Sequence, residues 1–212
     1  MHLPVASGGI EATLSLILAS FCGVFSLFRR APEFFRPRQL RLPTLSVRIQ
    51  PRGGMSDTSR KPRIALGADH AGFPVKETVR QFLQNAGYSV DDLGTWSEES
   101  VDYPDYGKAV GERVTSHQNE FGIAICGTGI GISIAANKVP GVRAALAHDV
   151  NTAKLAREHN DANVLAFGGR VVNGPQAILM VQAFLNTPFA GGRHERRIEK
   201  IHLIELDERH KQ

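Results

Sequence analysis

The 212-residue sequence predicts an α/β fold, a three-layer, Rossmann-like arrangement with about five parallel strands, helices on both faces and a C-terminal helix. From Arg63 onward, short apolar runs alternate with segments of helical spacing, which is typical of such a sheet. Hydrophobic residues make up 42% of the chain and charged residues 22%, as expected for a globular protein.

The first half of the domain is expected to contain three strands and two helices. Residues 64–67 are a short apolar run that ends at Gly67, so they predict a buried strand. Residues 75–86 carry apolar side chains three or four positions apart and stop at Gly87, which is typical of a helix. The elements expected next are a brief strand at 88–90, a helix at 103–114 after a Pro-containing loop, and an apolar strand at 121–125.

The second half continues the same alternation. The remaining expected elements are helices at 130–137, 150–158, 175–185 and 195–209, and strands at 143–147 and 164–167. In parallel sheets of this kind, ligands bind beyond the carboxyl ends of the strands. Those ends carry a concentration of polar and glycine residues: Asp69-His70, Cys126-Gly127-Thr128, His148-Asp149 and Gly168-Gly169-Arg170.

Residues 1–60 differ in composition from residues 61–212, which we predict to be the folded domain. They hold eight Arg, no Lys and three acidic residues, a net charge of +5, whereas the remainder has a net charge of −1. The positive charge of the whole chain therefore does not indicate a nucleic-acid-binding face on the domain. The two cysteines, Cys22 and Cys126, form no disulfide framework and suit a reducing compartment.

The N-terminal extension contains an apolar stretch at 13–28, shorter than the ~20 residues that span a bilayer comfortably. Three interpretations stay open: a signal peptide or anchor, an organelle-targeting leader within 1–54, or sequence upstream of a start at Met55. We expect this segment to be poorly ordered. The folded domain is expected in the cytoplasm, without a membrane or nucleic-acid partner.

The most informative stretch is a glycine-rich turn, 127–131, that follows Cys126 at the end of an apolar run. It lacks the Gly-Lys-Ser/Thr of a phosphate-binding P-loop, and Ile132 interrupts the dinucleotide-binding pattern. A site for a small anion at the backbone amides is compatible with it, as is a tight turn that only lets the next helix pack. Cys126 is either a small buried apolar residue or a group that moves a proton or attacks a substrate.

Histidine and arginine residues supply the other candidate groups. Asp69-His70 could bind a ligand or cap a helix, and His159-Asn160 could act on a ligand or end a helix. Arg193 and Arg197 lie four residues apart and, with Arg170, could grip a phosphate, although a solvated basic face is the alternative. A proton carrier, amide donors, histidines and a guanidinium cluster together suit aldose–ketose isomerisation of a sugar phosphate through an enediolate.

Residues 63–209 resemble the ribose-5-phosphate isomerase B family, which is shared with the bacterial galactose-6-phosphate isomerase subunits. The matching segments follow the family's order: GADHAG (67–72), DYPDY (102–106), ICGTGIGISIAANK (125–138), AREHNDANVLAFGGR (156–170) and GGRHERR (191–197). Some members place a Glu after the glycine loop, where this chain has Ile132, so the chain follows the branch that uses cysteine.

The resemblance implies that Cys126 shuttles the proton between C2 and C1 and that His159 opens the furanose ring. It implies that backbone amides of the loop stabilise the enediolate and that arginines hold the phosphate. The implied substrate contacts are Asp69, His70, Gly127, Thr128, Gly129, Ile130, Gly131, Asn160, Arg170, Arg193 and Arg197. Neither a metal nor an organic cofactor is implied. The family assembles as homodimers or homotetramers, with the pocket built across the subunit interface.

The expected activity is interconversion of ribose 5-phosphate and ribulose 5-phosphate in the pentose phosphate pathway. A preference for a six-carbon substrate, such as allose or galactose 6-phosphate, is an alternative. A protein that binds sugar phosphates without catalysis is a third interpretation, against which the joint presence of Cys126, Thr128 and His159 argues.

Overall fold

The computed structural model describes residues 60–209, and the N-terminal extension considered above lies outside the described residues. Five parallel strands form one sheet in the order β2-β1-β3-β5-β4, which confirms the predicted fold class. The strands are β1 (Arg63–Ala68), β2 (Ser89–Asp92), β3 (Phe121–Cys126), β4 (Ala144–Leu146) and β5 (Val164–Gly168).

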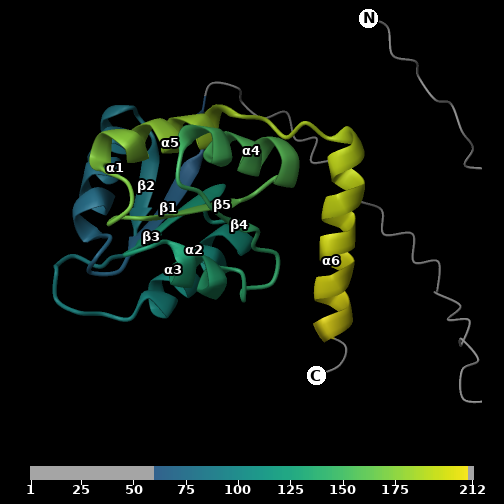
Figure 1. Ribbon diagram of the computed structural model, residues 1–212, viewed down its shortest axis with the longest axis horizontal. Helices are drawn as coiled ribbons and strands as arrows, with labels where there is room; N and C mark the ends of the chain where they lie inside the picture. The colour runs from purple at the N-terminus through teal and green to yellow at the C-terminus, as the bar shows by residue number, and fades with distance from the viewer. Residues whose placement is uncertain (1–59, 210–212) are drawn as a thin grey trace, which may run out of the picture. The chain divides into compact units, whose positions relative to one another are not determined.

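Helices cover both faces of the sheet (Figure 1). One face carries α1 (Phe73–Asn85), α4 (Val150–Asn160) and α5 (Gly174–Asn186), and the other carries α2 (Tyr103–Thr115) and α3 (Ile130–Ala136). A separate hydrophobic cluster fills each interface, because strands buried on both sides point alternate side chains into the two layers. Beyond α5, a short 3₁₀ turn, η1 (Gly192–His194), leads into α6 (Glu195–Arg209).

The order of the strands reverses beside β1. From β1 the chain goes to β2 on one side and then to β3 on the other. Such a reversal opens a crevice at the carboxyl ends of β1 and β3, where open α/β sheets bind ligands. The register aligns these ends, because Ala68 pairs with Ile125 and Cys126 pairs with Gly168.

Helix α4 runs from the carboxyl edge of the sheet back to its amino edge. It starts with a capping box in which the Asp149 carboxylate accepts the Thr152 backbone N–H at 2.7 Å. This hydrogen bond is the largest of the effects that lower the pKa of the Asp149 carboxyl below its ordinary value. The helix ends at Asn160, and the left-handed residue that terminates it is Asp161 (φ 44°) rather than Asn160.

Two arginines bind the Asp161 carboxylate at the end of α4. Arg157 Nη1 donates to Asp161 Oδ1 at 2.7 Å, and Arg143 Nη2 donates to Asp161 Oδ2 at 2.9 Å. Arg157 is almost buried, and its guanidinium lies over the rings of Phe121 and Phe184. These contacts fix the turn that follows His159 and Asn160.

Candidate active site

Three loops interlock at the carboxyl edge of the sheet: 69–72 after β1, 126–131 after β3 and 168–170 after β5. The Asp69 N–H donates to the Ile125 carbonyl at 3.1 Å, which joins the first loop to β3. The Gly169 N–H donates to the Cys126 carbonyl at 2.8 Å, and the Arg170 N–H donates to the Gly127 carbonyl at 3.1 Å. The polar residues that were expected to gather at these three strand ends do so.

The glycines of the turn allow backbone segments to approach closely. Gly129 has φ 81°, a left-handed conformation that favours glycine, and a Cβ there would lie 2.6 Å from the Phe167 carbonyl carbon. A Cβ on Gly168 would lie 2.6 Å from the carbonyl carbon of Thr128. Both distances are too short for any side chain, so a larger residue at either position would prevent this turn from forming.

Cys126 ends β3 as a free thiol whose residue is 3% exposed. The Gly129 N–H points at its Sγ, with 3.1 Å between nitrogen and sulfur. A backbone donor aimed at the sulfur stabilises negative charge there. The thiol also packs in the hydrophobic cluster beneath α2 and α3, so both interpretations of this residue have a structural basis.

Asp69 and His70 follow β1 in a tight turn. Asp69 is 5% exposed and accepts the Gly72 N–H on Oδ1 at 2.9 Å. Because the N-cap of α1 is Gly72, Asp69 shapes the turn before the helix and does not cap it. His70 Nδ1 lies 3.2 Å from the Val101 backbone nitrogen and 3.3 Å from the Val101 carbonyl oxygen, so the backbone of Val101 can hold the ring in either tautomer.

Arg170 and Tyr103 lie against the glycine turn. A Cβ on Gly127 would lie 3.3 Å from Arg170 Nη1, so the exposed guanidinium passes over the start of the turn. A Cβ on Gly131 would lie 2.6 Å from the ring of Tyr103, which is 41% exposed. Tyr103 was not among the predicted contacts, and its presence in the segment that resembles the family was the signal that could have identified it.

The remaining predicted groups gather elsewhere. His159, near the end of α4, stacks face to face on His194, with ring centroids 4.3 Å apart and an interplanar angle of 6°. Arg193 adjoins this stack, with its Nε 3.4 Å from His194 Nε2, and Arg197 lies farther along in the first turns of α6. Arg193 belongs to the 3₁₀ turn η1, which directly precedes α6.

This second group lies at the amino edge of the sheet. The Asn160 carbonyl accepts from Arg143 Nε at 3.2 Å, and Arg143 directly precedes the first residue of β4. The whole of β5 separates this edge from Gly168, which pairs with Cys126. Five extended residues span roughly 16 Å. Within one chain, His159 and Asn160 are therefore not brought together with Cys126.

Two further properties of the described residues bear on the kind of site. Between residues 60 and 209, no group of three or more His, Cys, Asp or Glu side chains is arranged to hold a metal ion. No helix in that range is long and apolar enough to cross a membrane.

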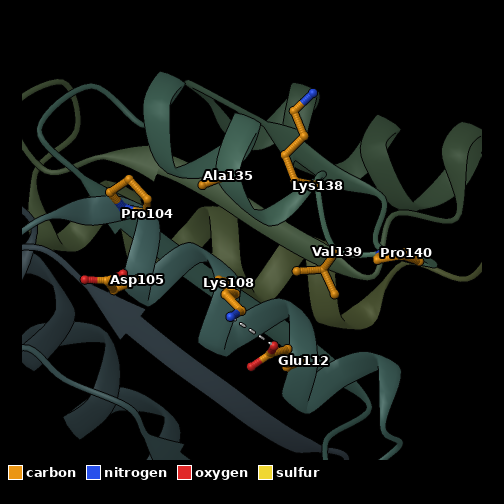
Figure 2. Close-up of a pocket in the computed structure, with 8 residues that line it drawn as sticks. All are labelled: Pro104, Asp105, Lys108, Glu112, Ala135, Lys138, Val139 and Pro140. Carbon is orange, nitrogen blue, oxygen red and sulfur yellow. Dashed lines mark ion pairs between the residues drawn. The ribbon is translucent and has the colours of Figure 1, made fainter. Parts of the chain in front are cut away.

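A hollow of about 390 Å³ lies apart from the predicted site residues, between α2 and the end of α3 (Figure 2). Its wall includes Lys108 and Glu112 of α2, whose charged groups lie 3.7 Å apart, together with the apolar side chains of Val139 and Pro140. None of the predicted catalytic or binding residues lines this hollow.

Comparison with known proteins identifies the family. A family model described as Ribose/Galactose Isomerase matches residues 64–201. The chain belongs to this family. It is 48% identical over 143 residues to ribose-5-phosphate isomerase B of Escherichia coli K12, an alignment that covers 68% of this chain and 96% of that one.

Solved structures of family members agree with the fold. The ribose-5-phosphate isomerase B of Clostridium thermocellum is 51% identical, with a TM-score of 0.68, over 68% of this chain and 98% of that one. The Mycoplasma genitalium enzyme, solved with bound ribulose-5-phosphate, is 42% identical, with a TM-score of 0.66, over 68% of this chain and 96% of that one. The domain described above thus shares its fold with these family members.

Proposed function

We propose that this chain is a ribose-5-phosphate isomerase of type B, which interconverts ribose 5-phosphate and ribulose 5-phosphate in the pentose phosphate pathway. The observation that carries the proposal is the free thiol of Cys126 beside the glycine turn, with the Gly129 N–H 3.1 Å from its sulfur, in a member of this isomerase family. A family member from Mycoplasma genitalium has been solved with bound ribulose-5-phosphate, which supports the choice of substrate.

In the proposed mechanism, His159 gives a proton to the ring oxygen of the bound furanose, and the C1 hydroxyl releases its proton to water as the ring opens to the aldehyde. The Cys126 thiolate then takes the proton from C2, and the electron pair moves through C1 to the aldehyde oxygen. The negative enediolate that forms is stabilised by backbone amides of 127–131. Cys126 returns its proton to C1, and the proton of the C2 hydroxyl moves to the oxygen on C1, which yields the ketose.

The proposed binding contacts divide into sugar and phosphate groups. Asp69 has one carboxylate oxygen bound to the Gly72 N–H, and the Val101 backbone holds Nδ1 of His70; the second Asp69 oxygen and His70 Nε2 suit sugar hydroxyls. Asn160 would bind the sugar as well. Arg170, Arg193 and Arg197 are exposed and would hold the phosphate, which guanidinium groups bind by paired hydrogen bonds.

We further propose that the active site is shared between two copies of the chain, as a homodimer or a pair of such dimers. The reaction needs Cys126 and His159 on one sugar, yet roughly 16 Å of β5 lies between their two edges of the sheet. A second copy that supplies His159, Asn160, Arg193 and Arg197 resolves this separation. A two-fold assembly would create two equivalent sites, each built from both chains.

The test is an isomerase assay on the full-length protein, followed by mixing two inactive variants. Cys126→Ala disables one half of the proposed site and Arg197→Ala disables the other. In a mixed dimer one of the two sites has both Cys126 and Arg197 intact. Random mixing makes about half of the dimers mixed, so about a quarter of wild-type activity should return. Activity no greater than that of the separate variants would refute a shared site, and an inactive wild-type protein would refute the isomerase assignment.

Six-carbon sugar phosphates are the second candidate, because the family includes galactose isomerases. The galactose type uses two different subunits, whereas this chain carries both the cysteine and the histidine segments, which favours a self-sufficient homo-oligomer. A panel of ribose 5-phosphate, allose 6-phosphate and galactose 6-phosphate separates the candidates by kcat/KM.

We also propose residues 61–212 as the isomerase domain, in keeping with the family match over 64–201. Whether residues 1–54 direct localisation is testable by comparing a full-length fluorescent fusion with one that starts at Met55. Identical diffuse cytoplasmic signals would argue against a targeting leader.

A further inference from the structure

His194 is a second imidazole that the proposed mechanism does not use, although it lies directly on one that it does. The rings of His194 and His159 are parallel within 6°, and their centroids are 4.3 Å apart. Both rings are only partly exposed. The segment that carries His194 is bound to the helix that carries His159, because the Ala190 N–H donates to the Glu158 carbonyl at 3.0 Å.

The turn that presents His194 depends on two glycines. Gly191 and Gly192 have φ values of 64° and 57°, which glycine adopts without strain. The His194 N–H closes the turn by donating to the Gly191 carbonyl at 3.1 Å. The stack thus rests on backbone hydrogen bonds and turn geometry as well as on contact between the rings.

The surroundings of His194 disfavour the charged form of its ring. Arg193 Nε, which can only donate, lies 3.4 Å from His194 Nε2, so Nε2 is the unprotonated nitrogen of that ring. Desolvation is the largest effect that lowers the pKa of His194, and His159, Arg193 and Arg197 lower it further, whereas Glu158 raises it. A positive charge on His194 would repel a positive charge on the stacked ring of His159.

We propose that His194 is a positioning residue for His159: its flat, uncharged ring holds the His159 imidazole in the orientation that delivers a proton to the ring oxygen of the sugar. This inference rests on the proposed function. Because His194 does not compete for the proton, His159 is the member of the pair that transfers it. The contact with Arg193 also ties the orientation of the stack to one of the proposed phosphate ligands.

A substrate that cannot close a ring separates this role from a general structural one. Ribose 5-phosphate exists mostly as a furanose and needs ring opening, whereas erythrose 4-phosphate stays open because the oxygen on its C4 carries the phosphate. A defect confined to His159 therefore slows turnover of ribose 5-phosphate and spares isomerisation of erythrose 4-phosphate. A folding or binding defect slows both.

The experiment compares full-length His194→Ala and His194→Phe with wild type, measuring kcat and KM for ribose 5-phosphate and for erythrose 4-phosphate. We expect His194→Ala to lose about tenfold in kcat for ribose 5-phosphate, with its KM and the kcat/KM for erythrose 4-phosphate changed less than about twofold. His194→Phe keeps a flat, uncharged ring, so it should recover most of that loss. The control is His202→Gln, two turns farther along α6, which should match wild type on both substrates.

Two outcomes would overturn the proposal. One is an equal loss on both substrates for His194→Ala, and the other is a His194→Phe variant no better than His194→Ala. Failure of the proposed function is distinguishable from either, because a wild-type protein that interconverts neither sugar phosphate would show it before any variant is made.

Discussion

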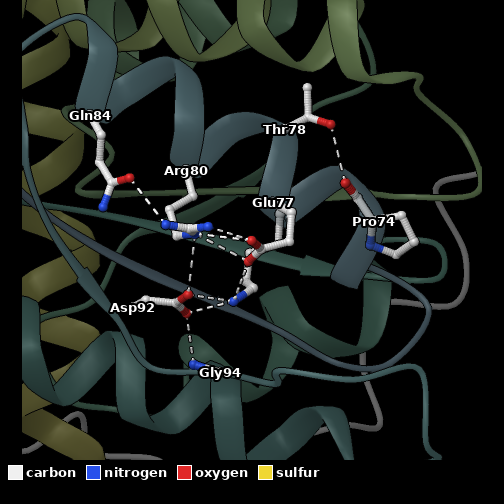
Figure 3. Close-up of polar contacts among 8 residues, drawn as sticks. Pro74, Glu77, Thr78, Arg80, Gln84, Asp92 and Gly94 are labelled. Carbon is white, nitrogen blue, oxygen red and sulfur yellow. Dashed lines mark hydrogen bonds and ion pairs between the residues drawn. The ribbon is translucent and has the colours of Figure 1, made fainter.

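Replacing Lys76 by Met tests an ion pair beneath the first loop of the proposed site. Lys76 is fully buried on α1, and its Nζ donates to both oxygens of Asp92, at 2.7 and 2.6 Å. Asp92 also accepts the Gly94 N–H at 3.0 Å, a contact that Figure 3 shows beside Glu77 and Arg80. The Gly94 carbonyl in turn accepts from the backbone of Ala68, directly before Asp69.

The expected cost follows from what Lys76→Met removes and what it leaves. Met fills much of the volume of the lysine stem, so little cavity forms. Asp92 loses its main partner while its side chain is only 19% exposed. Breaking a buried pair in this way costs about 3–5 kcal/mol. Because Asp92 keeps the Gly94 N–H and has Arg80 Nε 3.8 Å away, we expect the lower end, about 3 kcal/mol.

The assay is urea unfolding of wild type, Lys76→Met, Asp92→Asn and the double variant, followed by fluorescence and circular dichroism. Asp92→Asn leaves the buried ammonium of Lys76 with one carboxylate partner, Glu77 at 3.1 Å, and Lys76→Met leaves Asp92 without its ammonium partner. Because both single changes break the same ion pair, the double variant should cost less than the sum by about 2 kcal/mol. A Lys76→Met protein within about 1 kcal/mol of wild type, or costs that simply add, would refute the reasoning about this pair.

Three other predictions address the thiol, the turn and acid stability. Cys126→Ala should lose most turnover yet bind ribose 5-phosphate in calorimetry with about the wild-type affinity, and wild-type turnover would exclude Cys126 as the base. Gly129→Ala should cost about 2 kcal/mol or more in the free energy of unfolding, whereas Gly87→Ala, with φ 79° and open space, should cost about 1 kcal/mol, and equal costs would contradict the close approach of backbone at the turn. The hydrogen bond from Arg80 is the largest effect that lowers the pKa of Glu77 below its ordinary value of 4.5, so Glu77 contributes stability above that pH that is lost as the pH falls through its lowered pKa. The free energy of unfolding of Glu77→Gln should therefore decline less than that of wild type as the pH falls below about 4.5, and parallel declines would contradict the assignment.

Most of the fold follows from local patterns that need no knowledge of distant contacts. The apolar runs at 64–67 and 121–125 became β1 and β3, each extended by one or two residues, because a strand buried on both faces is uniformly apolar. The final helix has the predicted bounds. The candidate residues at the strand ends could also be predicted, since parallel strands place their carboxyl ends at one edge of the sheet.

The orientation of individual side chains depended on distant parts of the chain. Nothing in the spacing of α1 indicated that Lys76 is fully buried, because its partner Asp92 comes from a different strand. The stack of His194 on His159 likewise joins residues 35 positions apart through a glycine turn. Hydrogen bonds and ring contacts of this kind have no periodic signature in a sequence.

The sequence was enough to identify the parallel α/β fold, the glycine turn with its cysteine, and the histidines and arginines that accompany them. The tertiary structure was needed to show that these groups form two sets at opposite edges of the sheet. Residues at both ends of β5 are close in sequence, yet an extended strand holds them roughly 16 Å apart. A single chain therefore presents two halves of a site, and the proposal of a second copy rests on that separation.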